Sequence, residues 1–132
     1  MKRHKVLLIA LALFVALILG VLGLKTLLTG SMSSGGMFYR VPTDSMSPAL
    51  EAGDWAWFEK VEDPDELRAG DIILFWTVIN GERVKYAHRI VNIYDGGGCL
   101  IFETKGDQNP VVDPLTVHER EVLGVYRFKL PF

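Results

Sequence analysis

The feature that most constrains this chain is an uninterrupted apolar run over residues 6–24, near its N-terminus. These nineteen residues, VLLIALALFVALILGVLGL, include no charged side chain. At about 1.5 Å per residue they make a helix of roughly 28 Å, close to the hydrocarbon thickness of a bilayer. The run therefore predicts a transmembrane helix, and any globular fold has to come from the residues after it.

The charges around this run predict its orientation. Lys2, Arg3 and Lys5 precede it and only Lys25 follows closely, which favours a cytoplasmic N-terminus and a single-pass protein of the cell membrane. A cleavable secretory signal also has a basic start and an apolar core. Its apolar region is usually about 7–15 residues long, and no clear A-x-A site follows here. The length therefore favours a retained anchor.

The chain divides into three parts by composition. We expect a cytoplasmic flank and anchor over residues 1–28, a flexible linker over 29–36 (TGSMSSGG) and an extracytoplasmic domain over 37–132. After Lys25 there are ten Lys and Arg against sixteen Asp and Glu, a formal charge of −6, which argues against nucleic acid as a partner. Cys99 is the single cysteine, so no intrachain disulfide can form. No metal-ligand spacing occurs, and we expect neither metal nor cofactor.

The domain reads as mainly antiparallel β-structure. Residues 72–79 are followed by Asn80-Gly81, a strong two-residue hairpin signal, and then by a long strand over 82–94. A third strand over 99–104 completes a meander. Shorter strands are expected over 37–41, 55–58 and 122–128, and a polar connection with one helical turn over 62–70. The aromatic residues of this domain are expected in the core or on a membrane-facing rim rather than around a cofactor: Trp55, Trp57, Phe58, Phe75 and Trp76.

Ser45 is the candidate nucleophile. It lies in PTDSMSPAL, where Pro42 and Pro48 stiffen the backbone on both sides. A serine is a weak nucleophile until a base takes its proton. Ser47 directly precedes Pro48, and we expect it to be structural.

Three histidines are candidates for the base. His4 belongs to the cytoplasmic flank, across the membrane from Ser45, and His118 lies in the polar stretch TVHERE. His88 lies midway along a strand, where alternation places it on the face of Tyr86 and opposite Lys85. A lysine base is known in other serine peptidases, but Lys85 cannot easily share a site with His88. A hydrogen-bonded structural role for His88 remains the alternative.

The candidate acid lies in TKGDQNPVVDP, residues 104–114. A triad needs a carboxylate that fixes the imidazole tautomer and stabilises the imidazolium. Asp107 and Asp113 are both available, and the residue pattern leaves the choice between them open.

Five segments, taken together and in order, resemble the conserved boxes of type I signal peptidases: SMSPAL, GDWAWF, GDIILF, AHRIV and KGDQNPVVD. The histidine in the fourth box is typical of the archaeal and endoplasmic-reticulum type, whereas common bacterial enzymes have lysine there. The resemblance implies that Ser45 is the nucleophile, His88 the general base and Asp113 the triad acid. Asp107 would support the site, and Thr43 would be an oxyanion donor beside the Ser45 N–H.

The resemblance also implies a fold and an activity. The fold would be signal-peptidase-like, with coiled, partly barrel-like antiparallel sheets after one transmembrane helix. The enzyme would remove signal peptides from secretory preproteins by cutting after small residues at −1 and −3. Its partners would be these signal peptides, the lipid bilayer and the secretion translocon. One departure is Asp44, where glycine is frequent in the family, because it places a charge beside the nucleophile.

Two other readings of the sequence remain. A membrane-tethered β module that binds peptides or partner proteins without catalysis would have the same anchor and strands, and Asp44 is the feature that favours it. A self-cleaving repressor of related fold would use serine and lysine and would need a cytoplasmic DNA-binding domain. The anchor and the acidic charge disfavour that reading.

Overall fold

The structure is a computed structural model that describes residues 2–29 and 35–132. The chain forms two compact units, Met1–Ser33 and Ser34–Phe132, each of which is treated by itself below. The linker expected over residues 29–36 falls mostly on residues 30–34, which lie outside the described residues.

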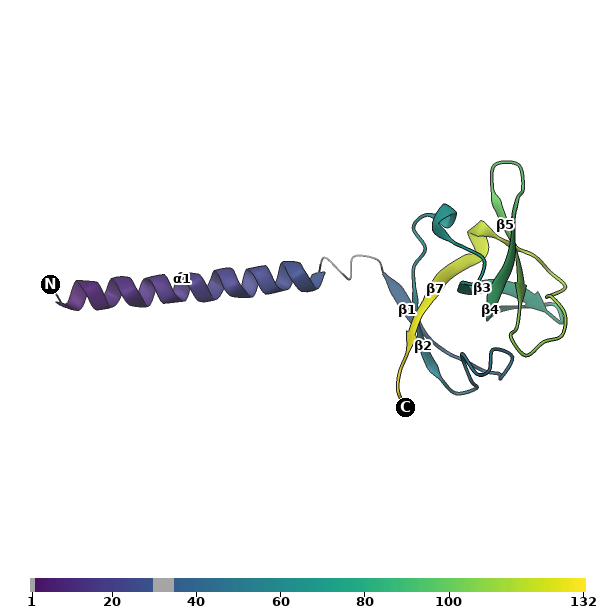
Figure 1. The fold of residues 1–132 in the computed structure, drawn as a ribbon, viewed down its shortest axis with the longest axis horizontal. Helices are drawn as coiled ribbons and strands as arrows, with labels where there is room; N and C mark the ends of the chain where they lie inside the picture. Colours follow the sequence, from purple (N-terminus) through teal and green to yellow (C-terminus); the bar gives the residue numbers. More distant parts are fainter. Residues whose placement is uncertain (1, 30–34) are drawn as a thin grey trace. The chain divides into compact units, whose positions relative to one another are not determined.

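The first unit is a single helix, α1 (Lys2–Thr29), drawn in purple and blue in Figure 1. Its segment His4–Val21 is long and apolar enough to cross a membrane, and its side chains are exposed. A helix with apolar side chains on every side is typical of a membrane span. The expected N-terminal apolar helix is therefore confirmed, and it fits a membrane protein.

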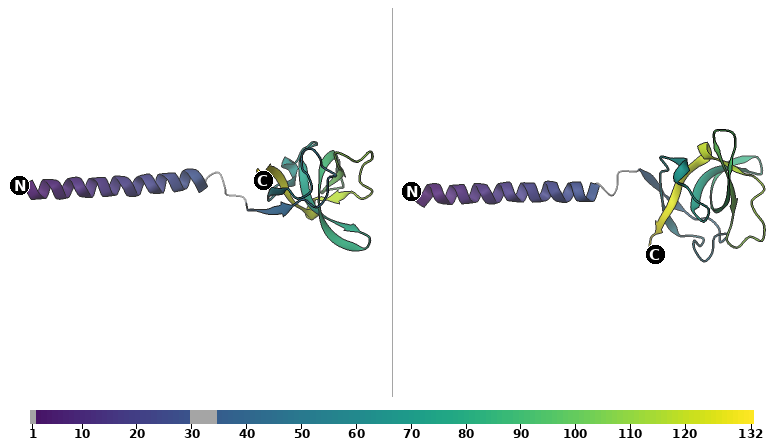
Figure 2. Two further views of the ribbon diagram at one scale, coloured as in Figure 1. Left: turned by 90° about the horizontal axis from the view of Figure 1, so that it is seen from below. Right: turned by 45° about the horizontal axis from the view of Figure 1, so that its top comes forward.

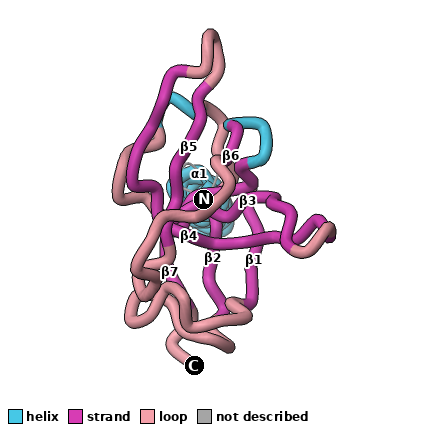
Figure 3. Tube along the Cα trace, turned by 90° about the vertical axis from the view of Figure 1, so that its right-hand side faces the viewer, coloured by secondary structure: helices cyan, strands magenta, loops and turns pink. Residues whose placement is uncertain are grey.

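The described part of the second unit contains one antiparallel sheet of seven strands in the order β1-β2-β7-β3-β4-β5-β6, and its strands are magenta in Figure 3. The expected mainly antiparallel β fold is confirmed. The last strand along the chain, β7, pairs with β2 on one edge and β3 on the other. The elements are β1 (Gly36–Arg40), β2 (Trp55–Glu59), η1 (Pro64–Glu66), β3 (Ile72–Ile79), β4 (Glu82–Asp95), β5 (Leu100–Lys105), β6 (Val117–His118), η2 (Glu119–Glu121) and β7 (Val122–Lys129).

The β3–β4 hairpin turns at Asn80-Gly81, as predicted, and its teal ribbon can be followed in Figure 2. Asn80 and Gly81 have φ angles of 52° and 81°, which only glycine and a few polar residues adopt readily. Because Ile79 pairs with Glu82 directly across the turn, the register of the hairpin is fixed. The register also fixes the position of His88, which lies on β4.

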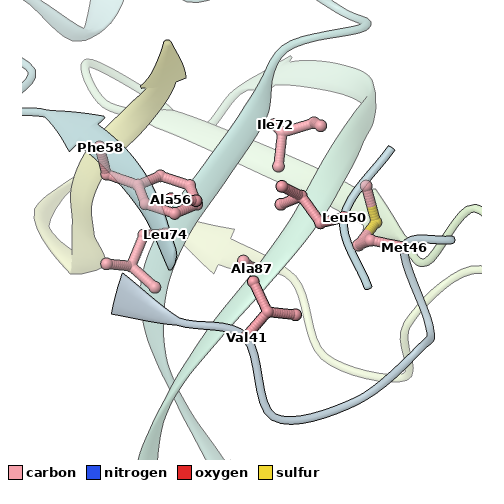
Figure 4. Packing of buried hydrophobic residues seen from close by; sticks show 8 residues of the cluster. All are labelled: Val41, Met46, Leu50, Ala56, Phe58, Ile72, Leu74 and Ala87. Carbon is pink, nitrogen blue, oxygen red and sulfur yellow. The ribbon is translucent and has the colours of Figure 1, made fainter. Parts of the chain in front are cut away.

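The first half of the central strand β3, residues 72–75, is buried on both faces, which explains its apolar side chains. Ile73 and Phe75 belong to one core cluster and Ile72 and Leu74 to another. The second of these, the Leu74 cluster, is shown in Figure 4 and also receives side chains from the segment around Ser45. Its buried members are Val41, Met46, Leu50, Ala56, Phe58, Ile72, Leu74 and Ala87.

The aromatic residues are divided between the core and the surface. Phe58 and Phe75 are buried in the core, whereas Trp55 is 41% exposed and lies on the surface. It lies on β2, whose pleat turns alternate side chains outward. Trp57 is half-buried and packs edge-on against the exposed Phe38, with ring centroids 4.9 Å apart. Strand β6 was not predicted, because two residues are too few to show alternation.

Candidate active site

Ser45 lies in the loop between β1 and β2, and this loop is fixed at both its ends and its centre. The N–H of Val41 donates to the Asp54 carbonyl (2.8 Å), and the N–H of Gly53 donates to the Val41 carbonyl (2.7 Å). Met46, next to Ser45, is 1% exposed and packs in the Leu74 cluster. A buried anchor beside the serine, with paired loop ends, holds the hydroxyl in place.

His88 is the histidine beside Ser45 among the described residues. It is 2% exposed, and its Nε2 lies 3.0 Å from Ser45 Oγ. Tyr86 packs edge-on against the imidazole, with ring centroids 4.7 Å apart. Lys85 instead lies over the Trp76 ring at 5.3 Å, as strand alternation predicts. His118 caps η2 by accepting the Arg120 N–H on Nδ1.

The structure brings Asp113 to the other side of the imidazole. Its Oδ2 lies 2.6 Å from His88 Nδ1, and the same oxygen accepts the Thr104 hydroxyl at 2.6 Å. The Asp113 N–H also donates to the Thr104 carbonyl (2.8 Å). Thr104 is fully buried, so Asp113 is positioned from the core by both its backbone and its side chain.

Asp107 pairs with Arg89 and has no hydrogen bond to His88 among the described residues. The guanidinium donates to both carboxylate oxygens, at 2.9 and 2.7 Å, and also to the Gly70 carbonyl at 2.7 Å. The hydrogen bonds from Arg89 lower the pKa of Asp107 below its usual range. Lys105 lies nearby but donates to the carbonyls of Gly106 and Asn109. Asp107 therefore orders the loop through Arg89.

This ion pair predicts a pH-dependent stability. Because the folded-state pKa of Asp107 is lowered, its contribution is present above the unfolded pKa of about 3.9 and lost as pH falls through the folded pKa. Asp107→Asn should lower the free energy of unfolding by about 1 kcal/mol at pH 7, since both side chains are partly solvent-screened. Urea unfolding at pH 7 and pH 3 measures the effect, and an equal loss at both pH values would contradict it.

The loop that carries both aspartates is also tied to the Ser45 turn. The Gln108 N–H donates to the Ser45 carbonyl and its side-chain amide to the Ser47 carbonyl, both at 2.9 Å. A Cβ on Gly106 would lie 2.9 Å from the Ser45 carbonyl oxygen, so the close approach of the two segments requires glycine there. The Ser45 turn and the loop that carries the two aspartates are therefore held together.

Thr43 and Asp44 precede the serine. Thr43 Oγ1 lies 3.1 Å from Ser45 Oγ, close to where a reacting carbonyl would sit. The Asp44 carboxylate accepts the Ala52 N–H at 2.8 Å, and its carbonyl accepts the Ser47 N–H at 3.0 Å. The unusual charge beside the serine therefore stabilises the turn through Ala52.

Sequence reasoning missed three residues of this site: Thr104, Arg89 and Gln108. The burial of Thr104 could have been predicted, because alternation in β5 puts its side chain on the same face as the buried Phe102. A hydroxyl at a core-facing position usually has a buried partner. Arg89 and Gln108 gave no comparable signal, since both occupy positions where charged and polar residues are ordinary.

The hydrogen-bonded series of Ser45, His88 and Asp113 is typical of one class of enzymes. A hydroxyl, an imidazole and a carboxylate joined by hydrogen bonds form the arrangement with which serine hydrolases activate their nucleophile. Their sequence separation is large, and a β-sheet with two connecting loops brings them together.

Comparison with known proteins identifies the family. Residues 2–94 match the family described as signal peptidase, peptidase S26. The chain is 32% identical over 132 residues to signal peptidase I W of Bacillus subtilis (strain 168), covering 94% of this chain and 68% of that protein. The chain therefore belongs to the signal peptidase family. The family match includes Ser45 and His88 and ends before Asp113.

Proposed function

We propose that this protein is a membrane-bound serine endopeptidase that removes N-terminal signal peptides from secretory preproteins, with Ser45, His88 and Asp113 as its catalytic residues. The observation that carries the proposal is the 3.0 Å approach of His88 Nε2 to Ser45 Oγ in a member of the signal peptidase family. The carboxylate of Asp113 at 2.6 Å completes the arrangement.

The chemistry follows from these positions. His88 accepts the Ser45 proton while Oγ attacks the scissile carbonyl, and the resulting oxyanion accepts hydrogen bonds from the Ser45 N–H and the Thr43 hydroxyl. The imidazolium is stabilised by Asp113 and gives its proton to the leaving amine. Water then attacks the acyl-enzyme with His88 again as base, which releases the signal peptide and restores Ser45.

We also propose that the protein is of the histidine type of this family, like the archaeal and endoplasmic-reticulum enzymes. His88 reaches the serine, and the nearest lysine on the strand, Lys85, lies over Trp76 and donates nothing to Ser45. A lysine mechanism would require Lys85 to cross its own strand.

The space beside the serine supports a preference for small residues before the cut. A cavity of about 10 Å³ lies between the Ser45 loop and β4, and Thr43, Ser45 and Ala87 line it. A volume of that order holds about one water molecule, which suits an alanine methyl group. A small side chain at −1 enters this cavity, and −3 lies on the same side of an extended substrate.

We assign the catalytic unit to the extracytoplasmic side, with a cytoplasmic N-terminus, because the basic residues precede α1. The lipid bilayer and the secretion translocon are its expected partners. Exposed aromatic side chains on β1, β2 and β7 support lipid contact: Phe38, Trp55 and Phe128. Alkaline extraction of membranes tests the anchor, and recovery of the protein in the supernatant would contradict it.

Cleavage of a model preprotein by the full-length protein in detergent micelles tests the function. Wild type should release the signal peptide, whereas Ser45→Ala should leave the preprotein whole. Ser47→Ala is the matched control, because this hydroxyl has only a weak contact to Glu51 at 3.4 Å, and it should keep most of the activity. A peptide-binding module without catalysis would leave the preprotein intact with all three proteins.

Thr104 provides a prediction about the acid. Thr104→Val keeps the side-chain shape but removes the donor to Asp113 Oδ2, so the carboxylate loses one of the two bonds that orient it. We expect kcat to fall about 10–100-fold with little change in KM, by analogy with partners that orient active-site ligands. Thr104→Ser should restore most of the loss. Equal activity of the valine and serine variants would show that the hydroxyl does not position Asp113.

A further inference from the structure

A second, larger cavity adjoins the candidate active site on the face of β4 that carries His88. Its volume is about 250 Å³, below the usual range of roughly 300–1,000 Å³ for small-molecule sites. Its walls are mostly apolar and come from both strands of the β3–β4 hairpin and from the loop after Asp113. The residues that the argument uses are Phe75, Thr77, Ile79, Tyr86, His88 and Leu115.

The two cavities lie on different faces of one strand. Ala87 lines only the small cavity and His88 only the large one, while Tyr86 contributes to the walls of both. Tyr86 and His88 point to the same face, since their rings are in edge-on contact, and Phe75 is the cross-strand partner of Tyr86. Neighbouring residues of a strand point to opposite faces. The side chains of Ala87 and His88 therefore point into different cavities on the two faces of β4.

The edge of β4 between them is open to an extended peptide. Residues 82–88 of β4 pair with β3 along one edge. On the other edge, β5 pairs with β4 only from Arg89 onward, so no strand of the described part of the chain pairs with residues 82–88 there. The loop after β1 faces this edge across the small cavity, and the Tyr39 hydroxyl reaches the Lys85 carbonyl at 3.0 Å. A peptide that adds to a sheet edge presents successive side chains to alternate faces.

We infer that the large cavity is the binding site for the side chain at position −2 of the preprotein, and that it takes an apolar side chain of leucine size or larger. The inference rests on the proposed function. If the −1 and −3 side chains face the small cavity, the residue between them faces the side of Tyr86 and His88. Leu115, 52% exposed, provides an apolar wall that such a side chain covers. Asp113 also lines the cavity and disfavours an acidic side chain there.

The test uses the full-length protein in detergent micelles and preproteins that differ only at −2, with alanine at −1 and −3. We expect kcat/KM for leucine at −2 to exceed that for alanine about tenfold, and that for glutamate to fall below alanine, as for substitutions in other apolar pockets. In Leu115→Lys the ratio of glutamate to leucine substrate should rise about tenfold or more. Val111→Lys adds the same charge to the same loop outside the cavity and should leave that ratio unchanged.

Equal kcat/KM for all preproteins that differ at −2 would overturn the inference. A Leu115→Lys effect on substrates varied at +1 instead of −2 would overturn it as well. In both cases the preprotein is still cleaved, so the proposed function stands. If Ser45→Ala and wild type both leave every preprotein whole, the proposed function itself has failed, and the inference fails with it.

Discussion

His88→Ala should lower kcat for preprotein cleavage by a factor on the order of 10⁶, the size of effect found when a serine peptidase loses its base. Without the imidazole 3.0 Å from Oγ, nothing among the described neighbours of Ser45 takes its proton. Single-turnover cleavage in detergent micelles measures the loss. Because His88 is buried, His88→Gln is a companion that fills more of the space, and it should be equally inactive.

Lys85→Ala and His118→Ala are the controls for this result. Lys85 lies over Trp76, and His118 caps η2, so both variants should keep most of the activity. A collapse of activity in Lys85→Ala, with His88→Gln still active, would show that lysine is the base. Binding of an uncleavable substrate to His88→Gln separates a chemical defect from loss of the fold.

Asp113→Asn should lower kcat by a factor on the order of 10⁴, as found for the equivalent change in a well-studied triad. An asparagine at this position cannot stabilise the imidazolium, and its amide can present N–H rather than oxygen to His88 Nδ1. Binding of a preprotein with an apolar side chain at −2 should change little, because the hydrogen bonds of the carboxylate go to His88 and Thr104. Comparison of kcat with the affinity for an uncleavable substrate measures both.

Asp107→Asn is the matched control for the acid, since it is the same change in the same loop. Its carboxylate pairs with Arg89, so we expect a loss of stability and a smaller loss of turnover. If Asp107→Asn is inactive and Asp113→Asn nearly normal, the assignment of the two aspartates is reversed.

The fold was predictable where local rules decide it. Asn80-Gly81 fixed the hairpin, and alternation along residues 82–94 placed His88 and Lys85 on opposite faces. The pairing of β7 between β2 and β3 could not be read from the chain, because it depends on contacts between distant segments. The division of the aromatic residues between core and surface could not be read for the same reason, since a pattern of large apolar residues does not say which face of a strand the rest of the protein covers.

The candidate site was predictable in its chemistry and less so in its geometry. A resemblance of five segments pointed to Ser45 and His88, but the residues alone left Asp107 and Asp113 equivalent. The structure separates the two by their partners, His88 for Asp113 and Arg89 for Asp107. Such partners are set by loop conformation, and a loop with Gly, Asn and Pro is compatible with several turns.

The insertion of β7 has a consequence for biosynthesis. The β1–β2 half of the sheet and the β3–β6 half are joined in one hydrogen-bonded sheet only through β7, whose residues are made after all three members of the candidate triad. At about 5–20 residues per second, the ribosome needs roughly 1–3 s to go from Asp113 to the end of β7. During that interval the nascent chain has the residues of a peptidase but not the sheet that unites them. Proteolytic activity would therefore arise late in synthesis.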